Sequence, residues 1–232
     1  MRVNAVIVAA GEGKRIGRHI PKPFLPLGSR PLILHTLSRF AESQAVRKVV
    51  LVTAEKEMAR CQNLIRSDSQ LRCLECVLHS GGPRRQDSVS RGLSRLDSDC
   101  EVVVIHDGVR PFVSSRLIDR CVEVAFKEGA VVVGVPVRDT IKVLSKDRRV
   151  RETPPRNSLW EVQTPQVFRV EIIREAYDRA AREGTEATDD AMLVERLGKS
   201  VRLLEGHTSN IKITVPEDLV FAEALLREGL IS

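Results

Sequence analysis

The sequence predicts an α/β protein: one domain built on a mostly parallel, twisted sheet, with a β-arm protruding from it. Short β-branched runs alternate along the chain with amphipathic stretches of helical period, which is the pattern of strands joined by right-handed crossovers. The strand-like runs are almost wholly apolar, as expected of strands covered on both faces. With 232 residues and 42% apolar content, the chain can bury the core of one large domain.

Strands and helices alternate regularly through the first part of the chain. A helix is expected over Pro31 to Ser43, with Pro31 at its first turn and apolar side chains along one side. Another is expected over Ser114 to Glu128, with Ser114 as the N-cap and Gly129 as the stop. The strands around them are predicted at Val3 to Ala9, Lys48 to Thr53, Glu101 to His106 and Ala130 to Val137.

Residues 138–163 interrupt this alternation. They hold two short β-like pieces, Ile141 to Leu144 and Arg148 to Glu152, together with paired prolines, many charges and little that could form a core. We therefore expect an extended β-arm. Beyond it we expect helices at Val170 to Glu183 and Asp189 to Leu197, strands at Ser200 to Glu205 and around Ile211 to Thr214, and a final helix from Pro216.

Composition limits the classes of function. The net charge of +6 suits either a nucleic acid or an anionic small substrate. Aromatic residues make up only 3%, few for stacking on single strands, and no helix-turn-helix or zinc-finger spacing appears, so nucleic acid is not the expected partner. No apolar run is long enough for a membrane span, and the first residues lack a secretory signal pattern. The odd number of five cysteines favours reduced thiols and a cytoplasmic location.

The most informative motif, AAGEGKRIG at residues 9–17, directly follows the first predicted strand. Its glycines let backbone N–H groups approach an anion, at the strand end where open α/β sheets bind ligands. It lacks the pattern of a P-loop, and Ile16 stands where a dinucleotide fingerprint needs Gly or Ala. Arg15 and Lys22 offer positive charge for a triphosphate. Taken alone, a glycine turn with solvated basic residues is the simpler interpretation.

A second glycine motif, GGPRRQDSV at residues 81–89, precedes a helix start at which Asp87 or Ser88 could cap. Its glycines could admit a base or ribose against the main chain, with Ser88 hydrogen-bonding the ligand. An ordinary loop with an N-cap explains the same spacing equally well.

A third motif, HDGVRPF at residues 106–112, closes an apolar strand. Asp107 is placed there to hold Mg²⁺ between its carboxylate and phosphate oxygens. The alternative is that Asp107 caps a turn or pairs with Arg110. We expect His106 to be packed and hydrogen-bonded, without a catalytic role.

One family shows the same motifs in the same order. From end to end, the chain resembles the 2-C-methyl-D-erythritol 4-phosphate cytidylyltransferases in AAGEGKRIG, PKPFLPLG, GGPRRQDSV, HDGVRPF, PVRDTIKV, RNSLWEVQTPQVF, ATDDAMLVERLG and NIKITVPEDL. The resemblance implies a Rossmann-like nucleotidyltransferase domain over residues 1–232, with residues 138–163 as an arm that embraces a second subunit. It also implies transfer of CMP from CTP to 2-C-methyl-D-erythritol 4-phosphate, releasing pyrophosphate, in isoprenoid precursor synthesis.

The resemblance further implies roles for individual residues. Arg15 and Lys22 would stabilise charge at the α-phosphate, and Arg156 and Lys212 would hold the acceptor phosphate for attack. Because Thr140 and Arg156 lie in the arm, they would enter the partner's site, making the homodimer a catalytic requirement. The remaining positions are Ala10, Gly11, Gly13, Gly82, Ser88 and Gly108 for the cytidine, Arg110, Thr140 and Thr164 for the acceptor, and Asp107 for Mg²⁺ or another divalent cation.

The sequence departs from the usual family pattern beside three of these residues, at Pro23, Pro83 and Pro155. Because proline has no N–H, any backbone contact at residue 83 must use the carbonyl. The nearest alternative activity is cytidylyl transfer to ribitol 5-phosphate, for which the nucleotide loops would look alike. One alternative of another class is a non-catalytic nucleic-acid binder, against which the low aromatic content argues. Another is a nucleotide sensor, against which the four basic residues at implied catalytic positions argue.

Overall fold

A central seven-stranded sheet organises the protein, seen here in a computed structural model that describes residues 1–11 and 20–229. The strand order is β11-β7-β10-β6-β1-β4-β5. β10 pairs antiparallel with β6 and β7, and the other neighbours are parallel, which confirms the predicted fold class. The strands are β1 (Val3–Ala9), β4 (Val46–Thr53), β5 (Glu75–Ser80), β6 (Val102–Asp107), β7 (Ala130–Pro136), β10 (Trp160–Arg169) and β11 (Arg202–Glu205).

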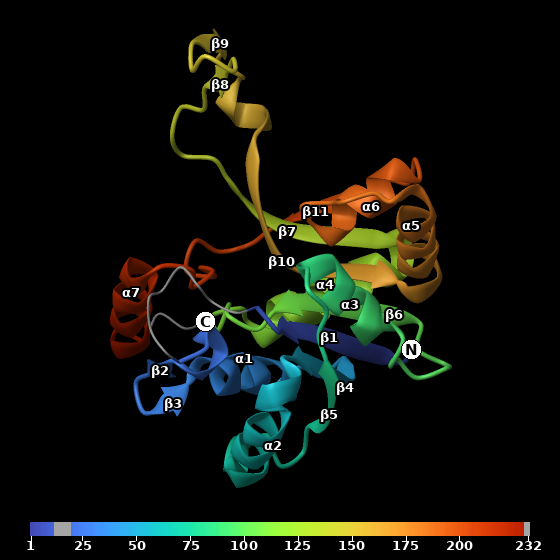
Figure 1. The fold of residues 1–232 in the computed structure, drawn as a ribbon, viewed down its shortest axis with the longest axis vertical. Coiled ribbons are helices and arrows are strands. Elements are labelled where there is room, and N and C mark those ends of the chain that lie inside the picture. The colour runs from blue at the N-terminus through green and yellow to red at the C-terminus, as the bar shows by residue number, and fades with distance from the viewer. Residues whose placement is uncertain (12–19, 230–232) are drawn as a thin grey trace.

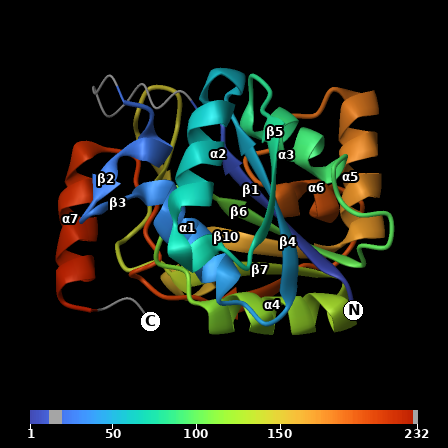
Figure 2. The ribbon, with the colours of Figure 1, turned by 90° about the horizontal axis from the view of Figure 1, so that it is seen from below.

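Helices cover both faces of this sheet (Figures 1 and 2). Because successive side chains of a strand point to opposite faces, Ile7 of β1 packs in the cluster that includes residues of α1, α2 and α4, whereas Val6 packs in the cluster of α3, α5 and α6. The helices are α1 (Leu32–Ala41), α2 (Met58–Ser67), α3 (Arg85–Leu93), α4 (Ser115–Glu128), α5 (Val170–Glu183) and α6 (Asp190–Arg196).

The predicted helix ends are confirmed where polar caps or glycine define them. The Ser114 Oγ accepts a hydrogen bond from the Leu117 N–H at 3.2 Å, which starts α4. Gly129, with φ of +97°, ends the same helix in a conformation that a side chain would disfavour. The Asp189 carboxylate accepts from the Met192 N–H at 3.0 Å and starts α6.

A third, smaller layer lies beside the sheet. It joins the hairpin β2 (Pro26–Leu27) and β3 (Arg30–Pro31) to the last described helix, α7 (Pro216–Arg227). Leu25, Leu27, Ile213 and Leu219 form its apolar centre. Figures 1 and 2 both show α7 on the opposite side of the molecule from α5. The strand predicted at 211–214 is wrong: these residues belong to no strand, and their apolar alternation instead packs Ile213 into this layer.

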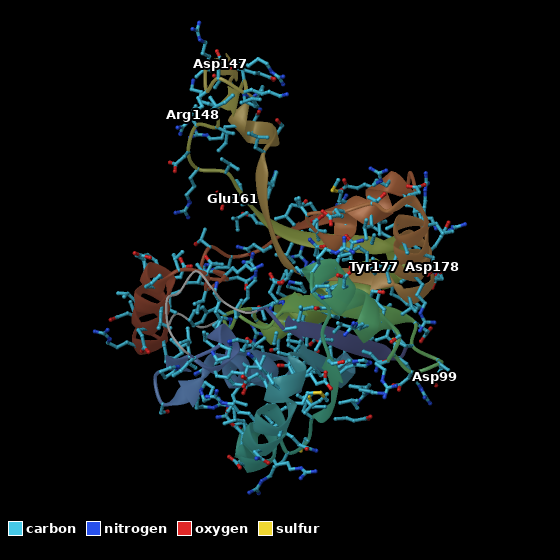
Figure 3. The ribbon with its side chains drawn as sticks, viewed as in Figure 1. Asp99, Asp147, Arg148, Glu161, Tyr177 and Asp178 are labelled. Carbon is cyan, nitrogen blue, oxygen red and sulfur yellow. The ribbon has the colours of Figure 1, made fainter. Side chains whose placement is uncertain are left out.

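The arm leaves the sheet at the end of β7 and returns as β10 (Figure 1). It carries two short antiparallel strands, β8 (Val143–Leu144) and β9 (Val150–Glu152). Residues 160–163, counted with the arm from the sequence, already pair with β7 in the sheet. Figure 3 shows Asp147 and Arg148 at the far end of the arm, with Glu161 near its root. Among the described residues, no helix combines the length and apolar character that crossing a bilayer requires.

Candidate functional site

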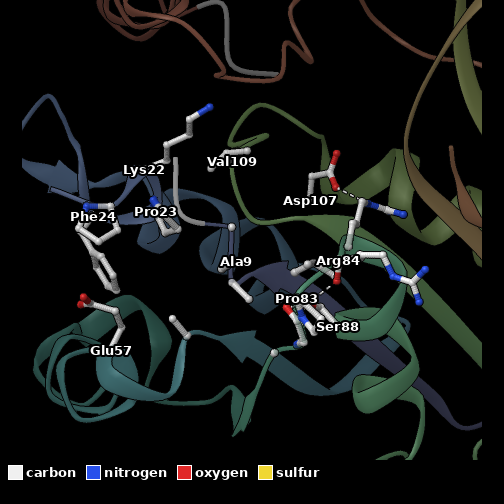
Figure 4. Close-up of a pocket in the computed structure, with 18 of the residues that line it drawn as sticks. Ala9, Lys22, Pro23, Phe24, Glu57, Pro83, Arg84, Ser88, Asp107 and Val109 are labelled. Atoms are coloured by element: carbon white, nitrogen blue, oxygen red, sulfur yellow. Dashed lines mark hydrogen bonds and ion pairs between the residues drawn. The ribbon is translucent and has the colours of Figure 1, made fainter. Parts of the chain in front are cut away.

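A cleft of about 1330 Å³ lies at the carboxyl ends of the central strands. One wall comes from the ends of β1 and β4 and the turn after β5, and the other from Pro21 to Phe24 and residues 212–214. Figure 4 shows Lys22 and Asp107 on either side of this space, with Ala9 between them. A single small ligand usually occupies about 300 to 1,000 Å³, so the cleft has room for a nucleotide and a second substrate together.

Close backbone packing forms the glycine-lined floor of the cleft. A Cβ on Gly81 would stand 2.3 Å from the Cβ of Ala10, so the turn after β5 can meet the turn after β1 only without a side chain. The Gly81 N–H donates to the Thr53 carbonyl at 2.8 Å, and the Gly108 N–H donates to the Val8 carbonyl at 2.9 Å. These bonds hold the ends of neighbouring strands in register. Ala10, Gly11 and Gly82 line the cleft, as the sequence motifs predict.

Ser88 lies at the cleft wall, but its hydroxyl group is hydrogen-bonded to the turn at residues 82–84. Its Oγ accepts from the Gly82 N–H at 3.1 Å and lies 3.1 Å from the Arg84 carbonyl, to which it can donate. The helix starts at Arg85, so neither Asp87 nor Ser88 is its N-cap. Instead the Asp87 carboxylate reaches back from inside the first turn to the Arg84 N–H at 3.1 Å. Ser88 therefore stabilises the turn at residues 81–84.

Asp107 is the electrostatic centre of the site. Its Oδ1 accepts from Arg85 Nε at 3.1 Å, and its Oδ2 lies 2.9 Å from Lys212 Nζ and 3.5 Å from Arg110 Nε. The side chain is 8% exposed, and burial alone would raise the pKa of the carboxyl group. The charges of Arg85, Lys212 and Arg110 outweigh burial and hold this pKa below its usual range. Asp107 is thus ionised and paired at neutral pH.

Most of the predicted acceptor-side residues converge on Asp107. The Thr164 Oγ1 accepts from the Asp107 backbone N–H at 3.1 Å. Arg110 is anchored by its Nη1, which donates to the Asn210 carbonyl at 2.7 Å. Lys22 approaches from the third layer, where its Nζ donates to the Thr214 carbonyl at 2.7 Å. Cationic side chains around the site therefore come from three distant stretches of the chain, at residues 22, 110 and 212.

Two predicted residues lie away from this cleft, and two are not described. Thr140 and Arg156 are exposed on the arm, where Arg156 Nη1 donates to the Arg138 carbonyl at 2.6 Å. Neither is among the residues that line the cleft. The predicted residues Gly108, Arg110 and Thr164 are not in that lining either, but they adjoin Asp107, which is. Gly13 and Arg15 fall within residues 12–19, outside the described part of the chain.

Arg85 is the site residue that sequence reasoning missed. It bridges two carboxylates, with Nε 3.1 Å from Asp107 and Nη2 2.9 Å from Asp190. Nothing in the run Arg84-Arg85 distinguishes it from its neighbour, whose guanidinium pairs on the surface with Asp87 and Glu186. The helical phase of α3 decides which of the two arginines points inward.

His106 is packed, as predicted. It is fully buried beside the Phe40 ring, at 5.3 Å between centroids, and its Nε2 lies 3.1 Å from the Arg110 carbonyl. Its Nδ1 finds no hydrogen-bond partner among the described residues. Burial lowers the pKa of the imidazole to about 4 despite the favourable charge of Asp107, so the ring is neutral and donates through Nε2.

Among the residues that the structure describes, Asp107 is the one carboxylate at the centre of the cleft that could bind a divalent cation. Within the described residues, no three His, Cys, Asp or Glu side chains gather as a metal site. Asp107 offers the hard oxygens that Mg²⁺ prefers, but both of them already lie near cations. The donor set fits an ion bound mainly by the phosphate oxygens of a nucleotide, with Asp107 as its one protein ligand.

Comparison with known proteins gives one consistent family. The family model described as 2-C-methyl-D-erythritol 4-phosphate cytidylyltransferase (IspD) matches residues 3–228. A curated protein of that name from Alkaliphilus metalliredigens is 43% identical over 227 residues, covering 98% of this chain and 94% of its own. The crystal structure of the cytidylyltransferase from Thermus thermophilus matches with a TM-score of 0.78 and 38% identity, covering 98% of this chain and 100% of its own. That of 4-diphosphocytidyl-2C-methyl-D-erythritol synthase from Anaerococcus prevotii matches with a TM-score of 0.87 and 30% identity, covering 97% of this chain and 96% of its own.

Proposed function

This chain belongs to the 2-C-methyl-D-erythritol 4-phosphate cytidylyltransferase family, and we propose that it performs the family's reaction in the cleft at the carboxyl ends of β1, β4 and β6. The enzyme transfers CMP from CTP to 2-C-methyl-D-erythritol 4-phosphate, giving 4-diphosphocytidyl-2-C-methyl-D-erythritol and pyrophosphate for isoprenoid precursor synthesis. The observation that carries the assignment to this cleft is that Lys22 and Lys212 line one glycine-floored space, where Arg110 lies 3.5 Å from the Asp107 carboxylate that Lys212 also contacts.

The chemistry requires positioned positive charge more than a strong base. An oxygen of the acceptor phosphate attacks the α-phosphorus of CTP, and the bond from that phosphorus to the pyrophosphate oxygen breaks. A phosphate monoester is already an anion near neutral pH, so no proton must be removed first. Positioning and electrostatic stabilisation then supply most of the rate. This explains why the cleft presents cations instead of a histidine paired with a carboxylate.

We assign the residues as follows. Lys22, with Arg15, stabilises charge at the α-phosphate, while Lys212, Arg110 and Thr164 hold the acceptor phosphate beside Asp107. The backbone at Ala10, Gly11, Gly13, Gly82 and Gly108, supported by Ser88, holds the cytidine. Both lysines line the cleft, and Lys22 lies across it from Asp107, the carboxylate that Lys212 contacts at 2.9 Å, which supports this division.

The proposed working form is a homodimer. In this proposal residues 1–232 form one nucleotidyltransferase domain, and the arm at 138–163 carries Thr140 and Arg156 into the partner's cleft. Apolar side chains on the arm support this, because Ile141, Leu144 and Val150 are 41%, 49% and 59% exposed in the single chain. An arm that is both apolar and strongly basic suits a second protein surface more than water.

Magnesium is the proposed cofactor. When bound, Mg²⁺ would neutralise phosphate charge and orient the triphosphate. Asp107 would be its protein ligand, sharing its carboxylate with Lys212 and Arg85. The proposed location is the cytoplasm, supported by the few, thinly spread cysteines, a usage common in reducing compartments.

Pyrophosphate release tests the proposed activity. The purified protein is given Mg²⁺ and 2-C-methyl-D-erythritol 4-phosphate with CTP, UTP or ATP, and then CTP with ribitol 5-phosphate. We expect rapid release only with CTP and the methylerythritol phosphate. Equal or faster turnover of ribitol 5-phosphate would overturn the assigned acceptor, and the absence of CTP-dependent release would overturn the activity.

Lys212→Ala tests the assigned site. Losing a cation that acts on a reacting phosphate should reduce kcat/KM by about 10²-fold or more. The matched control is Lys199→Ala, because both lysine side chains are 38% exposed and ion-paired, Lys199 with Glu175 at 2.6 Å. The control should keep the wild-type rate. A Lys212→Ala protein with normal turnover and an unchanged melting temperature would contradict the assignment.

A further inference from the structure

A chain of buried polar groups continues from the cleft into the protein. The Tyr177 hydroxyl donates to Asp190 Oδ1 at 2.6 Å, and Asp190 Oδ2 accepts from Arg85 Nη2 at 2.9 Å. Arg85 then reaches Asp107, and Asp107 reaches Lys212 at 2.9 Å. Asp190 is only 1% exposed and is not among the residues lining the cleft, so within the described part of the chain its direct link to the cleft is Arg85.

Asp190 is a fixed anchor for this chain. Its backbone N–H and that of Ala191 both donate to Gln166 Oε1 at 3.0 Å. Gln166 is held in turn, because its Nε2 donates to Asp189 at 2.7 Å. These bonds tie the start of α6 to β10, the strand that passes beside Asp107. The carboxylate of Asp190 therefore has one position available.

Arg85 connects this anchor to the reaction site. Its planar guanidinium donates to Asp190 through one nitrogen and to Asp107 through another, a geometry that a lysine ammonium cannot reproduce. Burial opposes the charged form of Arg85, but the carboxylates of Asp190 and Asp107 outweigh it and raise its pKa. Because Arg85 bonds to both carboxylates, it fixes the position of the Asp107 carboxylate relative to Asp190.

The charge balance around Asp107 explains how a fixed Asp107 carboxylate affects Lys212. Arg85, Arg110 and Lys212 face two carboxylates, Asp107 and Asp190, which leaves one positive charge in excess. Since Asp107 is shared among three cations, it holds Lys212 in place without neutralising it fully. An incoming phosphate dianion then meets a cation that is already oriented.

We propose that Arg85 and Asp190 are positioning residues of the enzyme: the buried chain Tyr177–Asp190–Arg85 sets the Asp107 carboxylate so that Lys212 is presented to the acceptor phosphate. The proposal rests on the function proposed above. In this proposal Arg85 and Asp190 act through Asp107 and Lys212 and do not touch the substrate themselves. Among the described residues, the Asp190 carboxylate bonds to Tyr177 and Arg85 and to none of Ala10, Gly11, Gly82 and Ser88, so we expect its loss to act mainly on the acceptor phosphate side of the cleft.

The test uses Asp190→Asn in the full-length enzyme. Asparagine keeps the shape and the acceptor for Tyr177 but removes the charge that holds Arg85. We expect the KM for methylerythritol phosphate to rise about tenfold while the KM for CTP changes less than twofold. Tyr177→Phe should shift the acceptor KM in the same direction by a smaller factor. Asp178→Asn is the control, since this exposed carboxylate adjoins Tyr177 on α5 (Figure 3) and should leave both constants unchanged.

A double substitution distinguishes positioning from loss of structure. In a Lys212→Gln background, Asp190→Asn should raise the acceptor KM no further, because the group it positions is gone. Should Asp190→Asn fold poorly, Arg85→Lys replaces it, since that variant keeps the charge but cannot bridge both carboxylates. Parallel increases in both KM values, an unchanged acceptor KM, or additive effects with Lys212→Gln would each overturn the proposal. A wild-type enzyme inactive with every acceptor would instead contradict the proposed function.

Discussion

The cleft and the arm hold their charged side chains in opposite ways. In the cleft, Asp107 is 8% exposed and has three cationic neighbours within 3.5 Å. At the arm's tip, Arg149 pairs with Asp147 while the two are 86% and 62% exposed, and ion pairs so exposed contribute little. Among the described residues, the Arg156 guanidinium bonds only to a carbonyl of its own arm. The cations of the cleft are therefore held by carboxylates of the same chain, whereas these cations of the arm stay largely exposed.

Mixing two inactive variants gives the largest expected effect. Arg156→Ala damages the arm and Lys212→Ala the cleft, and each variant alone should lose about 10²-fold or more in rate. If an arm completes its partner's cleft, a mixed dimer contains one site with both lesions and one intact site. Refolding the two variants together at equal amounts should then restore about a quarter of the wild-type rate.

The contrary outcome of the mixing experiment is equally clear. An arm that serves its own cleft would leave both sites of every mixed dimer damaged, and the mixture would stay inactive. Size-exclusion chromatography after refolding serves as the control that dimers have formed. Each variant refolded alone gives the baseline rate.

The pH dependence of the unfolding free energy should show whether the buried His106 imidazole stays neutral in the folded protein. The folded-state pKa of His106 is lowered to about 4, by burial first, with the charges of Arg110 and Arg85 also opposing protonation. The unfolded chain therefore binds this proton first, and stability falls as pH drops from about 6.5 towards 4. Between pH 7 and 5, His106 should account for about 2 kcal/mol of lost unfolding free energy.

Urea unfolding at the two pH values measures this loss. His106→Gln is the reference variant, because glutamine keeps a donor towards the Arg110 carbonyl but does not titrate. Between pH 7 and 5, the wild type should lose about 2 kcal/mol more unfolding free energy than the variant. Identical losses in the two proteins would show that His106 is accessible to protons in the folded state.

Ser88→Ala should have the smallest effect. It removes the hydroxyl that accepts from the Gly82 N–H and lies near the Arg84 carbonyl, a loss worth about 1 kcal/mol. Because the loop would loosen, the KM for CTP should rise about fivefold with little change in the acceptor KM. Ser90→Ala, exposed on the same helix, is the control. A larger effect on the acceptor KM than on the CTP KM would contradict the assigned role.

Much of the fold follows from local pattern. Apolar β-branched runs placed β1, β6 and β7 within one or two residues, and Ser114 with Gly129 bounded α4, because caps and glycine stops act locally. β10 was not predicted as a strand of the sheet, since Pro165 and several polar residues interrupt its pattern. Its place between β6 and β7 depends on pairing with strands distant in sequence.

The sequence predicted the site residues that lie in short motifs. It did not predict those that meet only because distant helices pack together. The glycine turns and Asp107 follow strands directly, so their position at one sheet edge can be expected from topology. Arg85 and Asp190 lie 105 residues apart along the chain, and their ion pair depends on how α3 and α6 pack on the same face. No local spacing encodes that contact.

The path of the chain into and out of the arm has a consequence for variation among relatives. Both roots of the arm are adjacent hydrogen-bonded strands, with Trp160 opposite Pro136 and Val162 opposite Gly134. Insertions or deletions at the tip therefore leave the pairing of β7 with β10 untouched, and with it Thr164 and Asp107. Evolution can lengthen, shorten or re-decorate this extension to match a new neighbour without disturbing the chemistry at its base.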